Sequence, residues 1–339
     1  AKAFHRTAHY DCCIASWFGE TNADFPDFMM RDYSKVLDLK YGENPHQRAA
    51  YYAEVGQPTH LLSGVEQLHG KQMGFNNLYD LHAARAICDE FTLPCVVIIK
   101  HNNPCGCALA ENLAAAYDKA FACDPESAYG SVIAVNRTVD MALAERLNEL
   151  FVEVLYAPGY DDDALELLTQ KANIRVLRGE ERRQINPGEF DFKRVTGGVL
   201  VQDRDSEVEE RDEMTVATTR HPSDQEWGDM LFAFRVAKHV KSNAIVIAKD
   251  LATLGVGAGQ MSRVDSTRIA IEKARSDLRG AVVGSDAFYP FPDAVEMALE
   301  QGITAVMQPG GSKGDEAAIK ACDAAEAAMV MTGRRHFLH

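Results

Sequence analysis

One stretch decides the fold class of this chain, and it reads Pro94-Cys95-Val96-Val97-Ile98-Ile99-Lys100-His101-Asn102-Asn103-Pro104-Cys105-Gly106. Its apolar first half is typical of a buried strand, and the polar residues that follow end that strand. The strand delivers Lys100 and His101 to its end, which is where an α/β enzyme places its chemistry. Two such basic groups can lower each other's proton affinity when both are partly desolvated. We therefore interpret Lys100 and His101 as a catalytic pair.

Outward from that strand, the chain alternates strand-like and helix-like segments, and this alternation predicts α/β layers. Its 339 residues exceed what one hydrophobic core usually supports, so we expect two domains with a boundary near residues 161–166. The net charge of −15 and the pI near 5.2 argue against a nucleic-acid-binding surface, which would carry a basic face. Anionic substrates would therefore need a local basic pocket.

The eight cysteines show no regular disulfide framework, and several lie in apolar patterns where a thiol acts as a small hydrophobic group. No apolar run reaches the roughly 18 residues of a membrane-spanning helix, and the first residues lack the layout of a signal peptide. We expect a cytoplasmic protein with reduced thiols.

Two helices have identifiable boundaries in the sequence. Residues 3–18 mix small, aromatic and aliphatic side chains in a helical pattern, and residues 19–26 break that pattern. A longer helix is expected from Ser223, a good N-cap residue, to His239.

The segment Gly255-Val256-Gly257-Ala258-Gly259 is a weak dinucleotide-binding signal, because it lacks the third glycine and the later acidic residue of the Rossmann fingerprint. Its glycines would still let the backbone approach a planar or anionic ligand closely. Arg263, at the start of a helix expected over 265–275, would have a side chain free to pair with a carboxylate or phosphate. We favour a ligand-binding loop over plain packing for this segment.

The aromatic turn Phe288-Tyr289-Pro290-Phe291 admits two interpretations, since aromatic residues around a proline often fill a core. The carboxylates of Asp286 and Asp293 flank it, which favours a rigid turn that binds a flat heteroaromatic ring. The basic ending at residues 334–339 would ordinarily be a solvated tail. In an acidic protein it is a candidate anion site.

A metal site is suggested by His101, Cys105 and Cys107, because zinc deaminases combine such residues. The spacing does not fit, since neither the H-x-E nor the P-C-x-x-C pattern of those enzymes is present. We therefore expect no catalytic metal. We interpret Pro104-Cys105-Gly106-Cys107 as a turn that shapes the pocket, in preference to a cysteine nucleophile.

Six motifs occur in an order that resembles one enzyme family. They are KYGENPHQ at 40–47, KHNNPCG at 100–106, VKSNAIV at 240–246, GVGAGQMSRVDSTR at 255–268, SDAFYPFPD at 285–293 and the RHFLH ending. The family is that of the bifunctional purine biosynthesis enzymes, which combine IMP cyclohydrolase with the transformylase that acts on 5-aminoimidazole-4-carboxamide ribonucleotide (AICAR). The resemblance runs from about Asp38 to the last residue. Residues 3–18 resemble the end of the cyclohydrolase domain, whose main body is absent from this sequence.

The resemblance implies formyl transfer from 10-formyltetrahydrofolate to the 5-amino group of AICAR, which gives the formylated nucleotide and tetrahydrofolate. It implies that His101 is the general base, that Lys100 assists it, and that Asn243 orients the formyl group or the amine. By the same resemblance the nucleotide is bound by Lys40, Tyr41, Gly130 and Arg335, and the folate is bound by Arg263, Phe288, Pro290, Phe291 and Asp293.

The resemblance further implies two tandem cytidine deaminase-like α/β/α subdomains, at residues 38–165 and 166–339, after a remnant of the cyclohydrolase domain and a linker at 1–37. It also implies a homodimer with active sites at the interface. Two departures limit these expectations. Pro292 stands where many relatives carry arginine, and Lys40 replaces a commoner arginine, which exchanges a bidentate phosphate grip for a point charge.

Two other classes of function stay open from the sequence. One is a zinc-dependent nucleotide deaminase, which stoichiometric zinc would reveal. The other is a catalytically silent purine-nucleotide-binding module, which would bind AICAR without transferring a formyl group.

Overall fold

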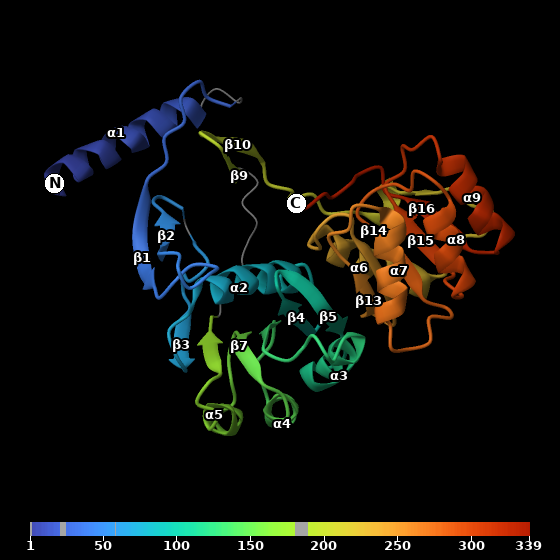
Figure 1. Ribbon diagram of the computed structural model, residues 1–339, viewed down its shortest axis with the longest axis horizontal. Helices are drawn as coiled ribbons and strands as arrows, with labels where there is room; N and C mark the ends of the chain where they lie inside the picture. The colour runs from blue at the N-terminus through green and yellow to red at the C-terminus, as the bar shows by residue number, and fades with distance from the viewer. Residues whose placement is uncertain (1, 21–24, 58, 180–188) are drawn as a thin grey trace. The chain divides into compact units, whose positions relative to one another are not determined.

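The structure is a computed structural model that describes residues 2–20, 25–57, 59–179 and 189–339 (Figure 1). It divides into two compact units, one of Ala1–Ser63 with Met73–Leu78 and one of Gly64–Gln72 with Tyr79–His339. The first unit contains helix α1 (Lys2–Glu20) and the antiparallel pair β1 (Tyr33–Leu39) and β2 (Ala49–Glu54). Helix α1 confirms the helix expected over 3–18. The break expected after it includes residues 21–24, which lie outside the described residues.

The second unit is built around one mixed sheet. Within its described residues twelve strands form this sheet, in the order β11-β16-β15-β14-β12-β13-β5-β4-β6-β7-β8-β3. The elements of the first half are β3 (Glu66–His69), α2 (Phe75–Cys88), β4 (Cys95–Lys100), β5 (Asn103–Leu109), α3 (Leu113–Cys123), β6 (Ser131–Val135), α4 (Met141–Asn148), β7 (Val152–Ala157), α5 (Asp162–Thr169) and β8 (Arg175–Arg178).

A separate hairpin, β9 (Phe190–Val195) with β10 (Gly198–Asp203), precedes the second half. The elements that follow are η1 (Arg211–Glu213), β11 (Thr215–Val216), α6 (Asp224–Lys238), β12 (Ile245–Lys249), β13 (Ala252–Gly257), α7 (Arg263–Lys273), β14 (Val282–Ser285), α8 (Asp293–Glu300), β15 (Ala305–Gln308), α9 (Asp315–Ala324) and β16 (Ala328–Met331).

The two halves of the sheet have the same topology. In the first half, β4 pairs antiparallel with β5 and β6, and β6, β7 and β8 run parallel. In the second half, β12 pairs antiparallel with β13 and β14, and β14, β15 and β16 run parallel. The helices follow in the same order, α2 to α5 and then α6 to α9. The α/β class is confirmed, while the cytidine deaminase-like description and the limits at 37/38 and 165/166 stay predictions.

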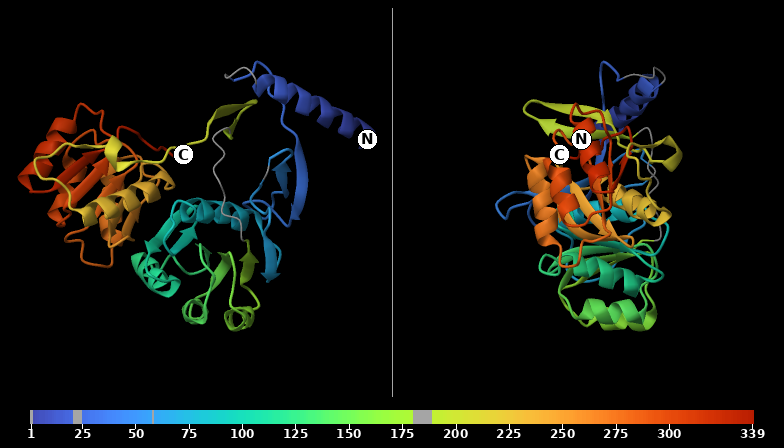
Figure 2. Two further views of the ribbon diagram at one scale, coloured as in Figure 1. Left: turned by 180° about the vertical axis from the view of Figure 1, so that it is seen from behind. Right: turned by 90° about the vertical axis from the view of Figure 1, so that its right-hand side faces the viewer.

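The central strands are buried on both faces, which explains the unbroken apolar sequence of residues 95–99. Each half has its own hydrophobic core. Ile98 and Leu143 belong to the core of the first half, and Ile247 and Tyr289 belong to that of the second. In the first half, α4 and α5 lie side by side in both Figure 1 and Figure 2. They cover one side of the strands of that half.

Helix α6 begins where the sequence predicts. The hydroxyl of Ser223 accepts a hydrogen bond from the Glu226 N–H at 3.2 Å, and the Glu226 carboxylate accepts one from the Ser223 N–H at 2.8 Å. This reciprocal capping box satisfies two N–H groups that the helix itself cannot pair. The predicted N-cap is confirmed, and the helix ends at Lys238 with His239 as its C-cap.

The prediction of a ligand-binding loop at residues 255–259 is wrong for two of its three glycines. Gly255 and Gly257 lie inside β13, where a Cβ would stand 2.0 Å from the Ala270 carbonyl oxygen and 1.9 Å from that of Ser266. The backbone of α7 therefore packs directly on the strand, and no larger side chain fits between them. These glycines serve packing.

The prediction of a turn at Pro104-Cys105-Gly106-Cys107 is also wrong. These residues lie within β5 and are buried. The reason is again a close helix, because a Cβ on Gly106 would stand 1.9 Å from the Ala120 carbonyl oxygen in α3. The glycines of β5 and β13 thus occupy corresponding places in the two halves.

Candidate functional site

The chain reverses immediately after Lys100, through a two-residue turn of His101 and Asn102 between β4 and β5. Both turn residues have left-handed backbone, with φ of 52° and 63°. That combination is typical of the type I′ turn, which fits the twist of a hairpin, and His and Asn tolerate it better than most residues. The sharp turn predicted after the Lys-His pair is confirmed, and it leaves His101 exposed at the tip.

A carboxylate of α2 holds this turn. Asp80 accepts hydrogen bonds from the Asn102 N–H at 2.8 Å and from the Asn102 side-chain amide at 3.1 Å. Burial raises the pKa of the Asp80 carboxyl above its ordinary value, although these bonds and the nearby His101 and Lys100 act in the opposite direction. Sequence reasoning missed Asp80, because nothing in its helix sets it apart from a solvent-facing carboxylate.

The ammonium of Lys100 is anchored to the backbone at the start of the neighbouring strand. Its Nζ donates to the Tyr129 carbonyl at 2.8 Å and to the Gly130 carbonyl at 3.0 Å. Gly130 has a φ of +66°, and a Cβ there would lie 3.4 Å from the Lys100 ammonium. The structure thus brings together two residues that the sequence assigned to different roles, one catalytic and one nucleotide-binding.

The second half repeats this arrangement without a histidine. Asp250 and Leu251 form a left-handed turn after β12, and the carboxylate of Asp229 in α6 accepts from both of their N–H groups at 3.0 and 2.7 Å. Lys249 ends the strand and donates to the Arg279 carbonyl at 2.8 Å, next to Gly280 with its φ of +76°. Asp250 occupies the place that corresponds to His101.

The side chain of Asn103 connects the His101 turn to the segment that precedes Asn243. Asn103 donates to the His101 carbonyl at 3.2 Å, and its oxygen accepts from the Lys241 N–H at 3.1 Å. Lys241 lies two residues before Asn243, so the predicted catalytic residues of the two halves are joined through Asn103.

The side chain of Asn243 is held by three hydrogen bonds, which leave one lone pair of its oxygen unused among them. Its amide donates to the carbonyls of Gln260 at 2.9 Å and Met261 at 3.2 Å, and its oxygen accepts from Arg263 at 2.8 Å. The loop between β13 and α7 therefore fixes the orientation of Asn243.

The prediction that Arg263 has a free side chain is wrong. Helix α7 begins at Arg263, after the N-cap Ser262, and Arg263 is 7% exposed. Its guanidinium donates to Asp286 at 2.6 Å and to the Ser285 hydroxyl at 2.8 Å. Asp286 is completely buried, and a buried carboxylate requires such a partner. Arg263 and Asp286 are 23 residues apart in the sequence, so no local pattern revealed that they form a pair.

The aromatic turn combines the two interpretations that the sequence left open. Tyr289 is 1% exposed and fills the second core, whereas Phe291 is 66% exposed. Phe288 is half-buried, and Pro290 and Asp293 are exposed.

The C-terminal residues are held in place. The Leu338 carbonyl accepts from the Ser242 N–H at 2.9 Å, and the His339 carbonyl accepts from the Lys241 ammonium at 3.1 Å. Arg335 is exposed, with its guanidinium 4.7 Å from the Phe337 ring. The backbone of this ending is therefore not a free, solvated tail. The anion site predicted there, with Arg335 as the phosphate-binding residue, stays a prediction.

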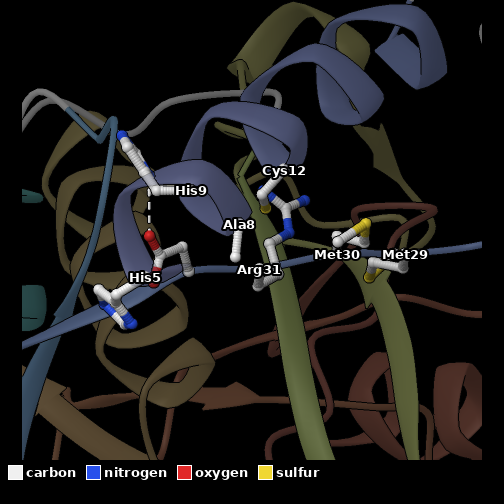
Figure 3. Close-up of a pocket in the computed structure, with 8 residues that line it drawn as sticks. His5, Ala8, His9, Cys12, Met29, Met30 and Arg31 are labelled. Atoms are coloured by element: carbon white, nitrogen blue, oxygen red, sulfur yellow. Dashed lines mark hydrogen bonds and ion pairs between the residues drawn. The ribbon is translucent and has the colours of Figure 1, made fainter. Parts of the chain in front are cut away.

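Lys40 and Tyr41 belong to the first unit and are exposed, with the Lys40 ammonium 6.0 Å from the Tyr41 ring centre. The same unit has a pocket of about 370 Å³ lined by His5, Ala8, His9, Cys12, Met29, Met30, Arg31 and Asp32. The His9 Nδ1 lies 2.8 Å from the Asp32 carboxylate, and the dashed line at His9 in Figure 3 marks this contact. None of the predicted site residues lines this pocket.

Within the described residues, no group of three or more His, Cys, Asp or Glu side chains is arranged to hold a metal ion. Cys105 is buried, and its thiol lies 3.5 Å from the Ile98 carbonyl. Burial raises the pKa of that thiol to about 12, which disfavours the nucleophilic thiolate. All eight cysteines are free thiols. No described helix combines the length and apolar character needed to cross a membrane.

Comparison with known proteins decides the family. A family model described as the AICARFT/IMPCHase bienzyme matches residues 1–273. The chain belongs to this family. The resemblance seen in the six motifs is thereby confirmed, and the match extends into the first residues, where the sequence suggested the end of the cyclohydrolase domain.

Individual members of the AICARFT/IMPCHase family are similar to this chain throughout. It is 46% identical over 341 residues to the bifunctional purine biosynthesis protein PurH of Acetivibrio thermocellus. The protein of the same description from Oceanobacillus iheyensis is 46% identical over 343 residues, and that from Bacillus cereus is 45% identical over 340. Each alignment covers 100% of this chain and 66% of the relative, so the chain spans about two thirds of the length of these relatives.

Proposed function

We propose that this chain is an AICAR formyltransferase of de novo purine biosynthesis, which moves the formyl group of 10-formyltetrahydrofolate to the 5-amino group of AICAR. One observation supports this most strongly. In a chain of the AICARFT/IMPCHase family, the imidazole of His101 stands exposed on a rigid turn, and within the described residues it forms no hydrogen bond of its own. It is therefore available to a substrate.

The chemistry requires a base. The exocyclic amine of AICAR is a poor nucleophile, because its lone pair is delocalised into the imidazole and carboxamide. His101 would take a proton from this amine as the nitrogen bonds to the formyl carbon, and such general-base assistance contributes about 10²- to 10⁴-fold. The tetrahedral intermediate would then expel N10 of tetrahydrofolate, which takes up a proton as it leaves.

Lys100 is suited to the negative charge that develops on the formyl oxygen. A lysine ammonium has three N–H donors, and the carbonyls of Tyr129 and Gly130 account for two of them. The third N–H would stabilise the oxyanion. The fixed side chain of Asn243 would set the orientation of the reacting groups.

The substrate contacts rest on the family resemblance. Arg335 would bind the phosphate of AICAR, with Lys40, Tyr41 and Gly130 as further nucleotide contacts. The exposed ring of Phe291 is suited to stacking on the flat pterin of the folate, beside Phe288, Pro290 and Asp293. Arg263 would act on the folate side chiefly by holding Asn243.

The wider setting is also proposed from the family. We infer a homodimer with active sites at its interface, no catalytic metal and a cytoplasmic location that suits free thiols. The relatives are described as bifunctional, so a longer protein that contains this sequence would also carry IMP cyclohydrolase activity.

The test is to incubate the purified chain with AICAR and 10-formyltetrahydrofolate and to measure tetrahydrofolate release. Formyl transfer by the metal-free protein supports the proposal. Ammonia release from a nucleotide, dependent on stoichiometric zinc, would favour the deaminase. AICAR binding without either product would favour the silent binding module.

A further inference from the structure

His336 lies in the C-terminal segment, next to Arg335, and its side chain is 2% exposed. Its Nδ1 lies 2.6 Å from the Asp205 carboxylate, and its Nε2 lies 2.6 Å from that of Glu209. Both carboxylates belong to the connection between β10 and β11, far from His336 in the sequence. The Nδ1 contact is a hydrogen bond, and the Nε2 contact is a close approach of a second carboxylate. Two carboxylates beside one buried ring favour the protonated imidazolium.

The backbone of the same residue connects to the candidate site. The His336 N–H donates to the Asp286 carbonyl at 2.9 Å. The Asp286 carboxylate in turn accepts from Arg263 at 2.6 Å and from the Ser242 hydroxyl at 2.6 Å. Arg263 holds Asn243, so His336 is anchored to the network that fixes this residue.

The residues after His336 run along the segment before Asn243. The Ser242 N–H donates to Leu338, and the Lys241 ammonium donates to His339. Without the His336 anchor, these contacts would have to hold an irregular exposed tail by themselves, and such tails ordinarily fray.

We propose that His336 is a positioning residue, which clamps the C-terminal segment between Asp205 and Glu209 and thereby holds Arg335 and the Ser242-Asn243 backbone in place for AICAR. The inference rests on the proposed function for its substrate. It assigns His336 no contact with AICAR or with the folate.

The experiment uses the full 339-residue chain with His336→Gln, which removes one of the two donors and the charge. Asp205→Asn is a second variant that perturbs the clamp from a half-exposed position. His9→Gln is the matched control, because His9 also pairs with a carboxylate, that of Asp32 at 2.8 Å, and belongs to the first unit. Folding of each variant is checked by circular dichroism.

Hydrogen exchange of the Ser242 amide is the first readout, because it reports the Leu338 contact whether or not the protein is active. We expect about tenfold faster exchange in His336→Gln and a smaller increase in Asp205→Asn, since local opening becomes easier. The KM for AICAR is the second readout, and it should rise about fivefold with a smaller change in kcat. His9→Gln should match the wild type in both.

Wild-type exchange at Ser242 together with wild-type KM in folded His336→Gln would overturn the clamp. If His336→Gln does not fold, Ser242 exchange and the KM for AICAR are measured on Asp205→Asn. Wild-type values of both in that variant would likewise overturn the clamp. Absence of formyl transfer in the wild type would contradict the proposed function, whereas the exchange measurement would still decide whether the clamp exists.

Discussion

The side-chain oxygen of Asn103 accepts a hydrogen bond from the Lys241 N–H at 3.1 Å, and it is the link between the His101 hairpin and the segment that carries Asn243. The same side chain donates to the His101 carbonyl at 3.2 Å. The two predicted catalytic residues therefore lie on backbone segments that the Asn103 side chain joins directly.

Replacing Asn103 with Ala should lower kcat about 10- to 100-fold, because small misplacements of reacting groups are costly. The KM for AICAR should change little. Steady-state kinetics measures both. Asn112→Ala is the control: Asn112 caps α3 through the Ala115 N–H, so its loss should cost about 1 kcal/mol of stability without affecting kcat. An equal loss of kcat in both variants would refute the link.

The repeated turns allow a paired test of Asp80. Asp80→Ala and Asp229→Ala each remove the acceptor for backbone N–H groups of a left-handed turn, and each should lower the free energy of unfolding by about 1–3 kcal/mol. Urea denaturation measures this cost. Only Asp80→Ala should reduce formyl transfer, because only its turn carries a histidine. Equal activity in the two variants would show that the turn geometry does not matter.

The close packing of α7 on Gly257 predicts that a larger side chain at this position lowers the stability of the protein. Gly257→Ala should destabilise the protein by about 1–3 kcal/mol, because its Cβ would stand 1.9 Å from the Ser266 carbonyl oxygen. Gly228 lies inside α6, where the nearest atom to a new Cβ is 3.9 Å away. Gly228→Ala should therefore stabilise the protein by about 0.5–1 kcal/mol. Opposite shifts in melting temperature are expected. A stabilised Gly257→Ala protein would contradict the packing.

The His336 clamp predicts a pH dependence of stability. Burial alone would lower the pKa of His336, but Asp205 and Glu209 raise it from its ordinary 6.5 to about 9. A raised pKa means that the stabilisation is complete below about pH 6.5 and is lost as the pH rises through about 9. At the acid end, the lowered pKa values of Asp205 and Glu209 set the limit. Lys238 of α6 acts on both carboxylates, and His239, the C-cap of that helix, acts on Asp205.

The measurement is the difference in unfolding free energy between wild type and His336→Gln. Its pH-dependent part should be of the order of 3 kcal/mol near pH 6 and should be lost near pH 10. A difference that stays constant across this range would show that His336 is not held as a cation.

The sequence revealed those features that depend on local pattern. The buried strand at residues 95–99, the N-cap Ser223 and the turn after Lys100 all follow from patterns within a few residues, and the structure has each of them. The family motifs identified the chain for the same reason.

Predictions for residues whose partners are distant in the sequence were wrong, or the residues were missed. The side chain of Arg263 appeared free because Asp286, its partner, lies 23 residues further along. Gly257 was predicted to belong to a ligand-binding loop, because its close contact with the Ser266 carbonyl of α7 forms only when the helix packs on the strand. The sequence assigned a role to Arg335 but none to its neighbour His336, because Asp205 and Glu209 are more than 120 residues away from His336 in the sequence. Tertiary packing alone brings these groups together.

If His101 is the base for formyl transfer, its loss must slow the reaction without preventing nucleotide binding. The decisive measurement is tetrahydrofolate release by His101→Ala, with AICAR binding measured on the same sample by calorimetry. Asp250→Ala is the control, because Asp250 holds the corresponding position of the second turn. We expect His101→Ala to lose about 10²- to 10⁴-fold in rate while it still binds AICAR, and Asp250→Ala to retain full activity. Turnover by His101→Ala at the wild-type rate would contradict this role of His101.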